Sequence, residues 1–121
     1  MSADVVAYSA LDWLTGILDD QTVYMGWGTG TGDAARTDTT LSSEATENRV
    51  AATPTRETIS QTNDTIVWTA TMTCNATPKT VTNVGVLSAS TAGSLIRKAN
   101  FTGIPVVEDD AIAFVVKWQF L

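Results

Sequence analysis

The spacing of hydrophobic and polar positions along the chain changes near residue 20. Before that point, apolar residues recur at steps of three and four, which is the spacing of one face of an α-helix. We therefore expect residues 1–20 to form a helical segment, capped by Ser2 or Asp4 and ended by the acidic pair at positions 19 and 20. The apolar stripe of this helix comprises Tyr8, Leu11, Leu14 and Leu18, widened by Trp13 and Ile17.

From residue 21 onward, the pattern has the period of two that is typical of β-strands. In residues 65–74, Trp68, Met72 and Cys74 share one face, and threonines fill most of the other. This position makes Cys74 a small buried hydrophobic residue in our interpretation, not a nucleophile. The last strand, 111–120, alternates over its whole length. Its inward positions are Ile112, Phe114, Val116, Trp118 and Phe120.

The strands combine into two hairpins and two further strands. We expect strands at 22–27, 49–60, 65–74, 80–88, 94–101 and 111–120. The second and third form a hairpin about the polar turn at 61–64, and the fourth and fifth form another. Pro54 places part of the second strand at a sheet edge or in a bulge, because proline has no N–H to donate.

Residues 28–47 show neither period, and we predict a long loop there. Loops of this length are usually functional or held by a partner. The glycines that lead into it alternate at Gly26, Gly28 and Gly30, which suits a strand that another backbone approaches closely. One short helix followed by six or more strands predicts a mostly β, single-domain fold over residues 1–121. We expect a β-sandwich or jelly roll spanning residues 21–121.

The composition narrows the classes of function. The chain has 13 acidic and 7 basic residues, a net charge of −6, one cysteine and no histidine. An acidic chain lacks the clustered Lys and Arg that nucleic acids and anionic membranes require. Without histidine, the most frequent general base and metal ligand is missing, and one cysteine forms no disulfide within the chain. We therefore predict a non-enzymatic protein with no catalytic residue, no metal and no cofactor.

Two polar motifs have an alternative functional interpretation. The glycine series from Gly26 resembles a phosphate-binding loop, but Asp33 follows it and no basic residue occurs before Arg36. The acidic run of Glu108, Asp109 and Asp110 reads as a solvated turn, with a calcium site shared with Asp33 or Asp38 as the alternative.

The tryptophans differ in their sequence context. Trp13, Trp68 and Trp118 fit the apolar periodicity and are predicted to lie in the core. Trp27 is flanked by glycines. It is a candidate to stack on a sugar, to anchor a protein interface, or to close one end of the sandwich.

The order of several short motifs resembles that of a known group of viral proteins. The motifs are Gly28-Thr29-Gly30-Thr31, Thr37-Asp38-Thr39-Thr40-Leu41 with Glu44, Arg49, Val84-Gly85-Val86-Leu87, Gly93-Ser94-Leu95-Ile96, Asp109-Asp110 and Lys117-Trp118-Gln119-Phe120. Together they resemble the small β-rich structural proteins of tailed bacteriophages and archaeal tailed viruses, above all capsid decoration proteins. One departure is that Asn83-Val84 stands where that pattern has an acidic residue before Gly85.

The N-terminus has no basic region followed by a long apolar stretch, and no apolar run approaches the roughly 20 residues of a membrane helix, so we expect no signal peptide and no membrane partner. The resemblance implies a virion protein made in the host cytoplasm. Its expected partners are the major capsid protein and copies of itself, as a trimer. We expect the helix and the long loop to make these contacts. The candidate contact residues are Tyr8, Leu11, Trp27, Thr29, Thr31 and Leu41. Two alternatives are a tail, baseplate or fibre component, and a carbohydrate-binding module in which Trp27 and Tyr24 stack on sugar near Asp33.

Overall fold

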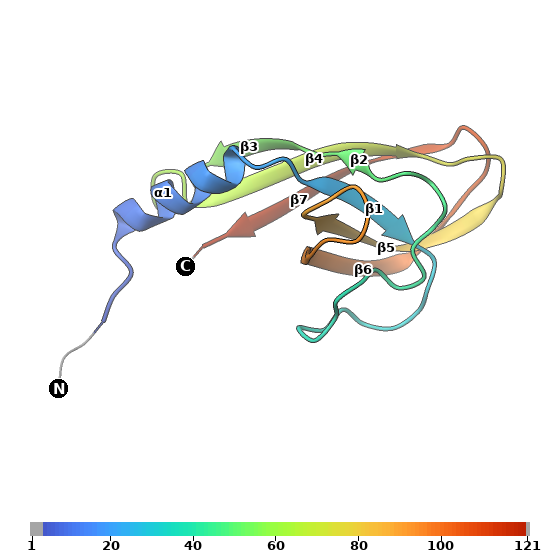
Figure 1. The fold of residues 1–121 in the computed structure, drawn as a ribbon, viewed down its shortest axis with the longest axis horizontal. Helices are drawn as coiled ribbons and strands as arrows, with labels where there is room; N and C mark the ends of the chain where they lie inside the picture. Colours follow the sequence, from blue (N-terminus) through green and yellow to red (C-terminus); the bar gives the residue numbers. More distant parts are fainter. Residues whose placement is uncertain (1–3, 121) are drawn as a thin grey trace. The chain divides into compact units, whose positions relative to one another are not determined.

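The computed structural model describes residues 4–120 and is mostly β, with one helix near the N-terminus (Figure 1). Seven strands follow the helix and form two sheets. The four-stranded sheet has the order β2-β1-β5-β6, and the three-stranded sheet has the order β3-β4-β7. The elements are α1 (Tyr8–Asp19), β1 (Tyr24–Gly28), β2 (Val50–Ala51), β3 (Thr53–Glu57), β4 (Thr65–Thr73), β5 (Lys79–Leu87), β6 (Leu95–Val106) and β7 (Ala111–Gln119).

The residues group into two compact units, which we describe separately. The helical unit contains residues 4–21, Thr53–Thr69 and residues 115–120, and the sandwich unit contains Thr22–Ala52 and Ala70–Phe114. The helical unit therefore holds α1 and β3, whereas the whole four-stranded sheet lies in the sandwich unit.

The core of the sandwich unit forms where side chains of the two sheets meet. Trp27 from β1 packs edge-on against Phe114 from β7, with ring centroids 6.3 Å apart. Buried Met72 and Cys74 from the β4 segment and Val81 from β5 complete the centre of this cluster. These contacts between layers make the fold a β-sandwich, as the alternating pattern predicted.

In the helical unit, α1 packs beside β3 (Figure 1). The helix buries Leu11 and Thr15, and the hydroxyl of Thr15 donates a hydrogen bond of 2.7 Å to the carbonyl of Asn63. On β4, the indole of Trp68 is fully buried and lies 6.4 Å, centroid to centroid, from that of Trp118. The helix therefore packs against its own chain through a narrow buried stripe formed by Leu11 and Thr15.

Much of the predicted secondary structure is confirmed. Both hairpins form, as β3 with β4 and β5 with β6. Pro54 lies on β3, an edge strand of its sheet, where its missing N–H costs no ladder hydrogen bond. In β7 the residues that alternate with the predicted inward positions are exposed from Ala111 to Lys117, and the inward residues from Ile112 to Trp118 are partly buried. Asp64 shapes the turn between β3 and β4, accepting hydrogen bonds from the amides of Ile59, Ser60 and Gln61.

Three local predictions were wrong. The single strand predicted at 49–60 is two strands in different sheets. β2 pairs with β1, and the amide of Ala52 still donates to the carbonyl of Val23, whereas from Thr53 onward the chain pairs with β4. Asp4 does not cap the helix, since Ala7 holds the cap position with no side-chain hydrogen bond, and Ser2 lies outside the described residues. Trp13 is not a core residue, because 67% of it is exposed.

Candidate protein-binding surface

The glycines of β1 and β5 form a groove across the four-stranded sheet. Gly26 and Gly85 are directly opposite one another in the β1–β5 ladder. A Cβ built at Gly85 lies 2.6 Å from a methyl group of Leu41, and one at Gly26 lies 3.1 Å from the other methyl. The side chain of Leu41 therefore fills the space that two missing side chains leave on this face of the sheet.

The backbone of the long loop lies equally close to the sheet. A Cβ at Gly28 would lie 2.3 Å from the carbonyl oxygen of Ser42. Buried Asn83 on β5 accepts a hydrogen bond from the amide of Ser42 and donates one to its carbonyl, both 3.1 Å long. The alternating glycines thus admit another backbone, as the sequence predicted, and this backbone belongs to the same chain.

The structure places the six predicted contact residues differently from one another. Leu11, Trp27 and Leu41 are buried within the chain, with 5%, 1% and 4% exposed. They cannot meet a partner without unfolding, so their assignment as contact residues is corrected. Tyr8 and Thr31 are exposed and Thr29 is half-buried, so these three remain accessible.

Trp27 has a structural role inside the sandwich unit. Its indole N–H donates a hydrogen bond of 2.9 Å to Oε1 of Glu47, and its ring packs on Phe114. Stacking on a sugar requires an exposed ring face, which this position lacks. The idea of a sugar platform formed by Trp27 and Tyr24 is therefore corrected.

The most buried ion pair of the sandwich unit joins the carboxylate of Glu47 and the ammonium group of Lys79. Burial raises the pKa of Glu47, but donors from the Asn75 amide, Lys79 and Trp27 outweigh it and hold this pKa at about 2. Burial likewise lowers the pKa of Lys79, and the hydrogen bond to Glu47 more than compensates, so that its pKa is raised. Both groups are charged at neutral pH, so neither is poised to exchange a proton, and the pair stabilises the fold.

The acidic run before β7 forms a turn. Asp110 accepts a hydrogen bond of 3.0 Å from the amide of Val107, and Asp109 has a positive φ of 70°. The backbone amide of Asp109 donates to the carbonyl of Cys74. Within residues 4–120, no three acidic, cysteine or histidine side chains come together in a way that would hold a metal ion.

Most of the exposed large apolar side chains lie in the helical unit. Val5 and Val6 precede the helix and are exposed, as is Tyr8 in its first turn. We call residues 4–8 the N-terminal arm. Further along the helix, Trp13 and Ile17 are exposed side by side at a spacing of one turn.

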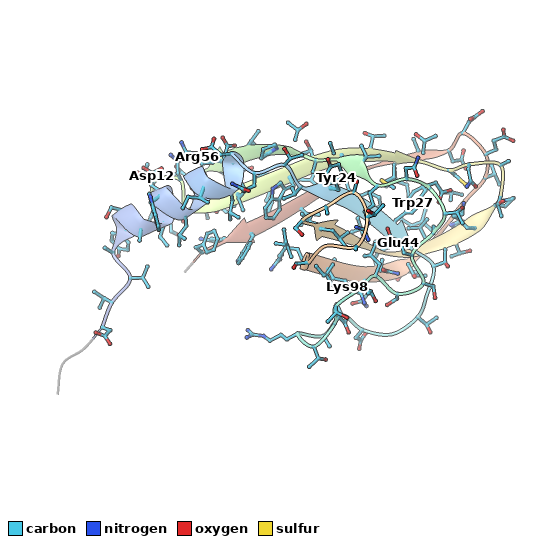
Figure 2. All side chains as sticks on the ribbon, viewed as in Figure 1. Asp12, Tyr24, Trp27, Glu44, Arg56 and Lys98 are labelled. Atoms are coloured by element: carbon cyan, nitrogen blue, oxygen red, sulfur yellow. The ribbon has the colours of Figure 1, made fainter. Side chains whose placement is uncertain are left out.

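A depression of about 430 Å³ lies beside Trp13 and Ile17. At one side of it, the guanidinium of Arg56 donates to the carboxylate of Asp12 at 2.9 Å. Figure 2 labels both side chains, which come from α1 and β3. Its remaining lining includes Gly16, Asp19 and Asp20. No basic residue occupies the last turn of α1, so these carboxylates add to the negative end of the helix dipole.

The exposure of Trp13 has a signal in the sequence. At 100° per residue, Trp13 lies about 200° around the helix from Leu11 and close to the direction of Asp20. The buried stripe of Leu11 and Thr15 spans only about 40°. The angles of a helical wheel that starts at Leu11 therefore place Trp13 on the solvent side. The three- and four-residue spacing of apolar residues alone does not reveal this.

Comparison with protein-family models finds no match, and comparison with curated protein sequences finds no relative. Among residues 4–120, no helix is long and apolar enough to cross a membrane.

Proposed function

We propose that this chain is a non-enzymatic virion structural protein, a capsid decoration subunit that binds the outer capsid surface and sister subunits. The observation that carries the proposal is the exposed N-terminal arm, in which 88% of Val5, 63% of Val6 and 67% of Tyr8 are accessible. Contiguous exposed apolar residues mark protein interaction sites, since water contact with such a surface is unfavourable. The arm is the surface that we assign to the capsid.

The fold supports this role because a β-sandwich provides a rigid scaffold for such contacts. The polar loop is fixed to its own sheet through Leu41 and Asn83, so it presents one surface. A preorganised surface loses less conformational entropy when it binds. The order of motifs that resembles capsid decoration proteins gives the proposal its viral context.

A head-binding assay tests the proposal. Purified chain is mixed with heads that lack it, the heads are pelleted, and the bound chain is quantified at increasing concentration. We expect saturable binding, and we expect the triple substitution Val5→Ser, Val6→Ser and Tyr8→Ser to abolish it.

Two controls make this result specific. The double variant Val107→Ser and Val115→Ser removes exposed apolar side chains elsewhere on the chain and should bind heads as the unmodified protein does. Deletion of residues 1–8 should abolish binding and leave the circular dichroism of the sheets unchanged. If the unmodified chain does not bind heads, or if the triple variant binds them unchanged, the proposal is wrong.

A further inference from the structure

The tip of the long loop presents a single unpaired guanidinium. Among residues 4–120, Arg36 is the basic side chain that forms no hydrogen bond or ion pair within the chain. Arg36 is exposed. Five other basic residues form ion pairs, and Arg97 also has an interaction.

This part of the loop is held in one conformation by hydrogen bonds. Arg36 lies within a turn closed by a bond of 3.0 Å from the amide of Asp38 to the carbonyl of Ala35. The carboxylate of Asp38 accepts from the amide of Ala35 at 2.9 Å and pairs with Lys98 on β6, also at 2.9 Å. Asn100 on β6 accepts from the amide of Ala34 at 2.8 Å. The turn therefore presents Arg36 at a fixed place above β6.

The depression on α1 has the chemistry that complements an arginine. Trp13 offers an exposed aromatic face on which a guanidinium can stack. Asp19 and Asp20 line the same depression at the negative end of the helix dipole. The depression already holds one guanidinium, since Arg56 pairs with Asp12 at its side.

We propose that copies of this chain associate head to tail, with Arg36 of one copy bound beside Trp13, Asp19 and Asp20 of the next. The occupant of the depression is thus a second copy, because the same chain carries both the unpaired cation and the unneutralised acidic, aromatic surface. The inference rests on the proposed function, whose sister-subunit contact it specifies. The contact joins two different surfaces, the loop tip with Arg36 and the depression on α1, and every copy carries both.

Charge exchange provides a test with an internal rescue. By sedimentation velocity at low ionic strength, we expect the unmodified chain to associate and Arg36→Glu to weaken this at least about tenfold in Kd. The double variant Asp19→Arg and Asp20→Arg should be equally impaired. A mixture of the two impaired variants should associate again, because each provides the charge that the other now lacks.

Matched variants separate this effect from net charge. Lys117→Glu makes the same change of charge as Arg36→Glu, and Glu108→Arg combined with Asp109→Arg makes the same change as the double variant at Asp19 and Asp20. All three control positions are exposed and outside the lining of the depression, so these variants should leave association unchanged. Trp13→Ser should weaken association, and Arg36→Ala should weaken it less than Arg36→Glu.

Three results would overturn the inference: a chain that stays monomeric at all concentrations, association that Arg36→Glu does not change, or a mixture that does not recover. Head binding distinguishes this failure from that of the proposed function. Arg36→Glu with normal self-association but lost head binding would assign the loop tip to the capsid instead. Normal self-association with no head binding would contradict only the capsid assignment.

Discussion

The contact of Leu41 with Gly85 allows a quantitative test of how the long loop is held. Leu41 is buried, and truncating a buried leucine to alanine costs about 2–5 kcal/mol of unfolding free energy. A methyl group added at Gly85 would lie 2.6 Å from Leu41 Cδ2 and 3.1 Å from the carbonyl oxygen of Arg97. Overpacking of this kind costs about 1–3 kcal/mol.

The double variant should be more stable than the sum of these costs implies. In Leu41→Ala combined with Gly85→Ala, the new methyl group occupies space that the leucine has vacated. We expect the two substitutions together to cost at least about 1 kcal/mol less than their sum, which lies between about 3 and 8 kcal/mol. Urea unfolding of the four proteins, followed by tryptophan fluorescence and circular dichroism, measures this coupling.

Gly28 provides the contrasting case for the same assay. A methyl group at Gly28 meets the backbone carbonyl of Ser42 at 2.3 Å, which truncation of Leu41 does not remove. Gly28→Ala should therefore stay destabilising in the Leu41→Ala background. If Leu41→Ala and Gly85→Ala add to within about 0.5 kcal/mol, Leu41 does not occupy the glycine groove and the reasoning is refuted.

Three further predictions concern single side chains. The pKa of Glu47 is held at about 2, below its ordinary 4.5, so the stability that this carboxylate contributes is complete above pH 4.5 and is lost as the pH falls towards 2. Glu47→Gln should flatten that part of an acid-unfolding curve, and a curve as steep as before would contradict the assignment. Trp27→Phe should cost at least about 1 kcal/mol more in urea unfolding than Trp68→Phe, because Trp27 loses its bond to Glu47 whereas the buried N–H of Trp68 has no partner; equal costs would argue against this. Trp13→Phe should remove most of the fluorescence that acrylamide quenches readily, whereas persistent quenching would mean that Trp13 is not the accessible indole.

Periodicity predicted those parts of the fold that depend on neighbours along the chain. The alternation in β7 and the composition of the turn before Asp64 were sufficient to place them. The alternation of β1 also indicates the burial of Trp27. Tyr24 is the one side chain on the face that carries Gly26 and Gly28, which leaves Met25 and Trp27 as the core side chains of the other face. The two exposed roles considered for Trp27, in sugar stacking and in an interface, did not take this alternation into account.

The features of the surface that could not be predicted from the sequence depend on contacts between residues far apart along the chain. Leu41 stands in a polar stretch, and its burial follows from the path of the loop across β1 and β5, which no local pattern encodes. No local pattern distinguishes Arg36 from the other basic residues. That it has no partner among residues 4–120 follows only from where the fold places the acidic groups. The exposure of Trp13 alone was accessible to prediction, from the angles of the helical wheel.

The proposed function, decoration of a capsid, is tested most directly in the particles of the virus that this proposal takes to encode the chain. Purified particles are separated into heads and tails, and each fraction is quantified by mass spectrometry for this chain and for the major capsid protein. We expect recovery with heads, at a copy number comparable to that of the major capsid protein. Recovery with tails would replace decoration by a tail or baseplate role, and absence from both fractions would contradict a virion role altogether.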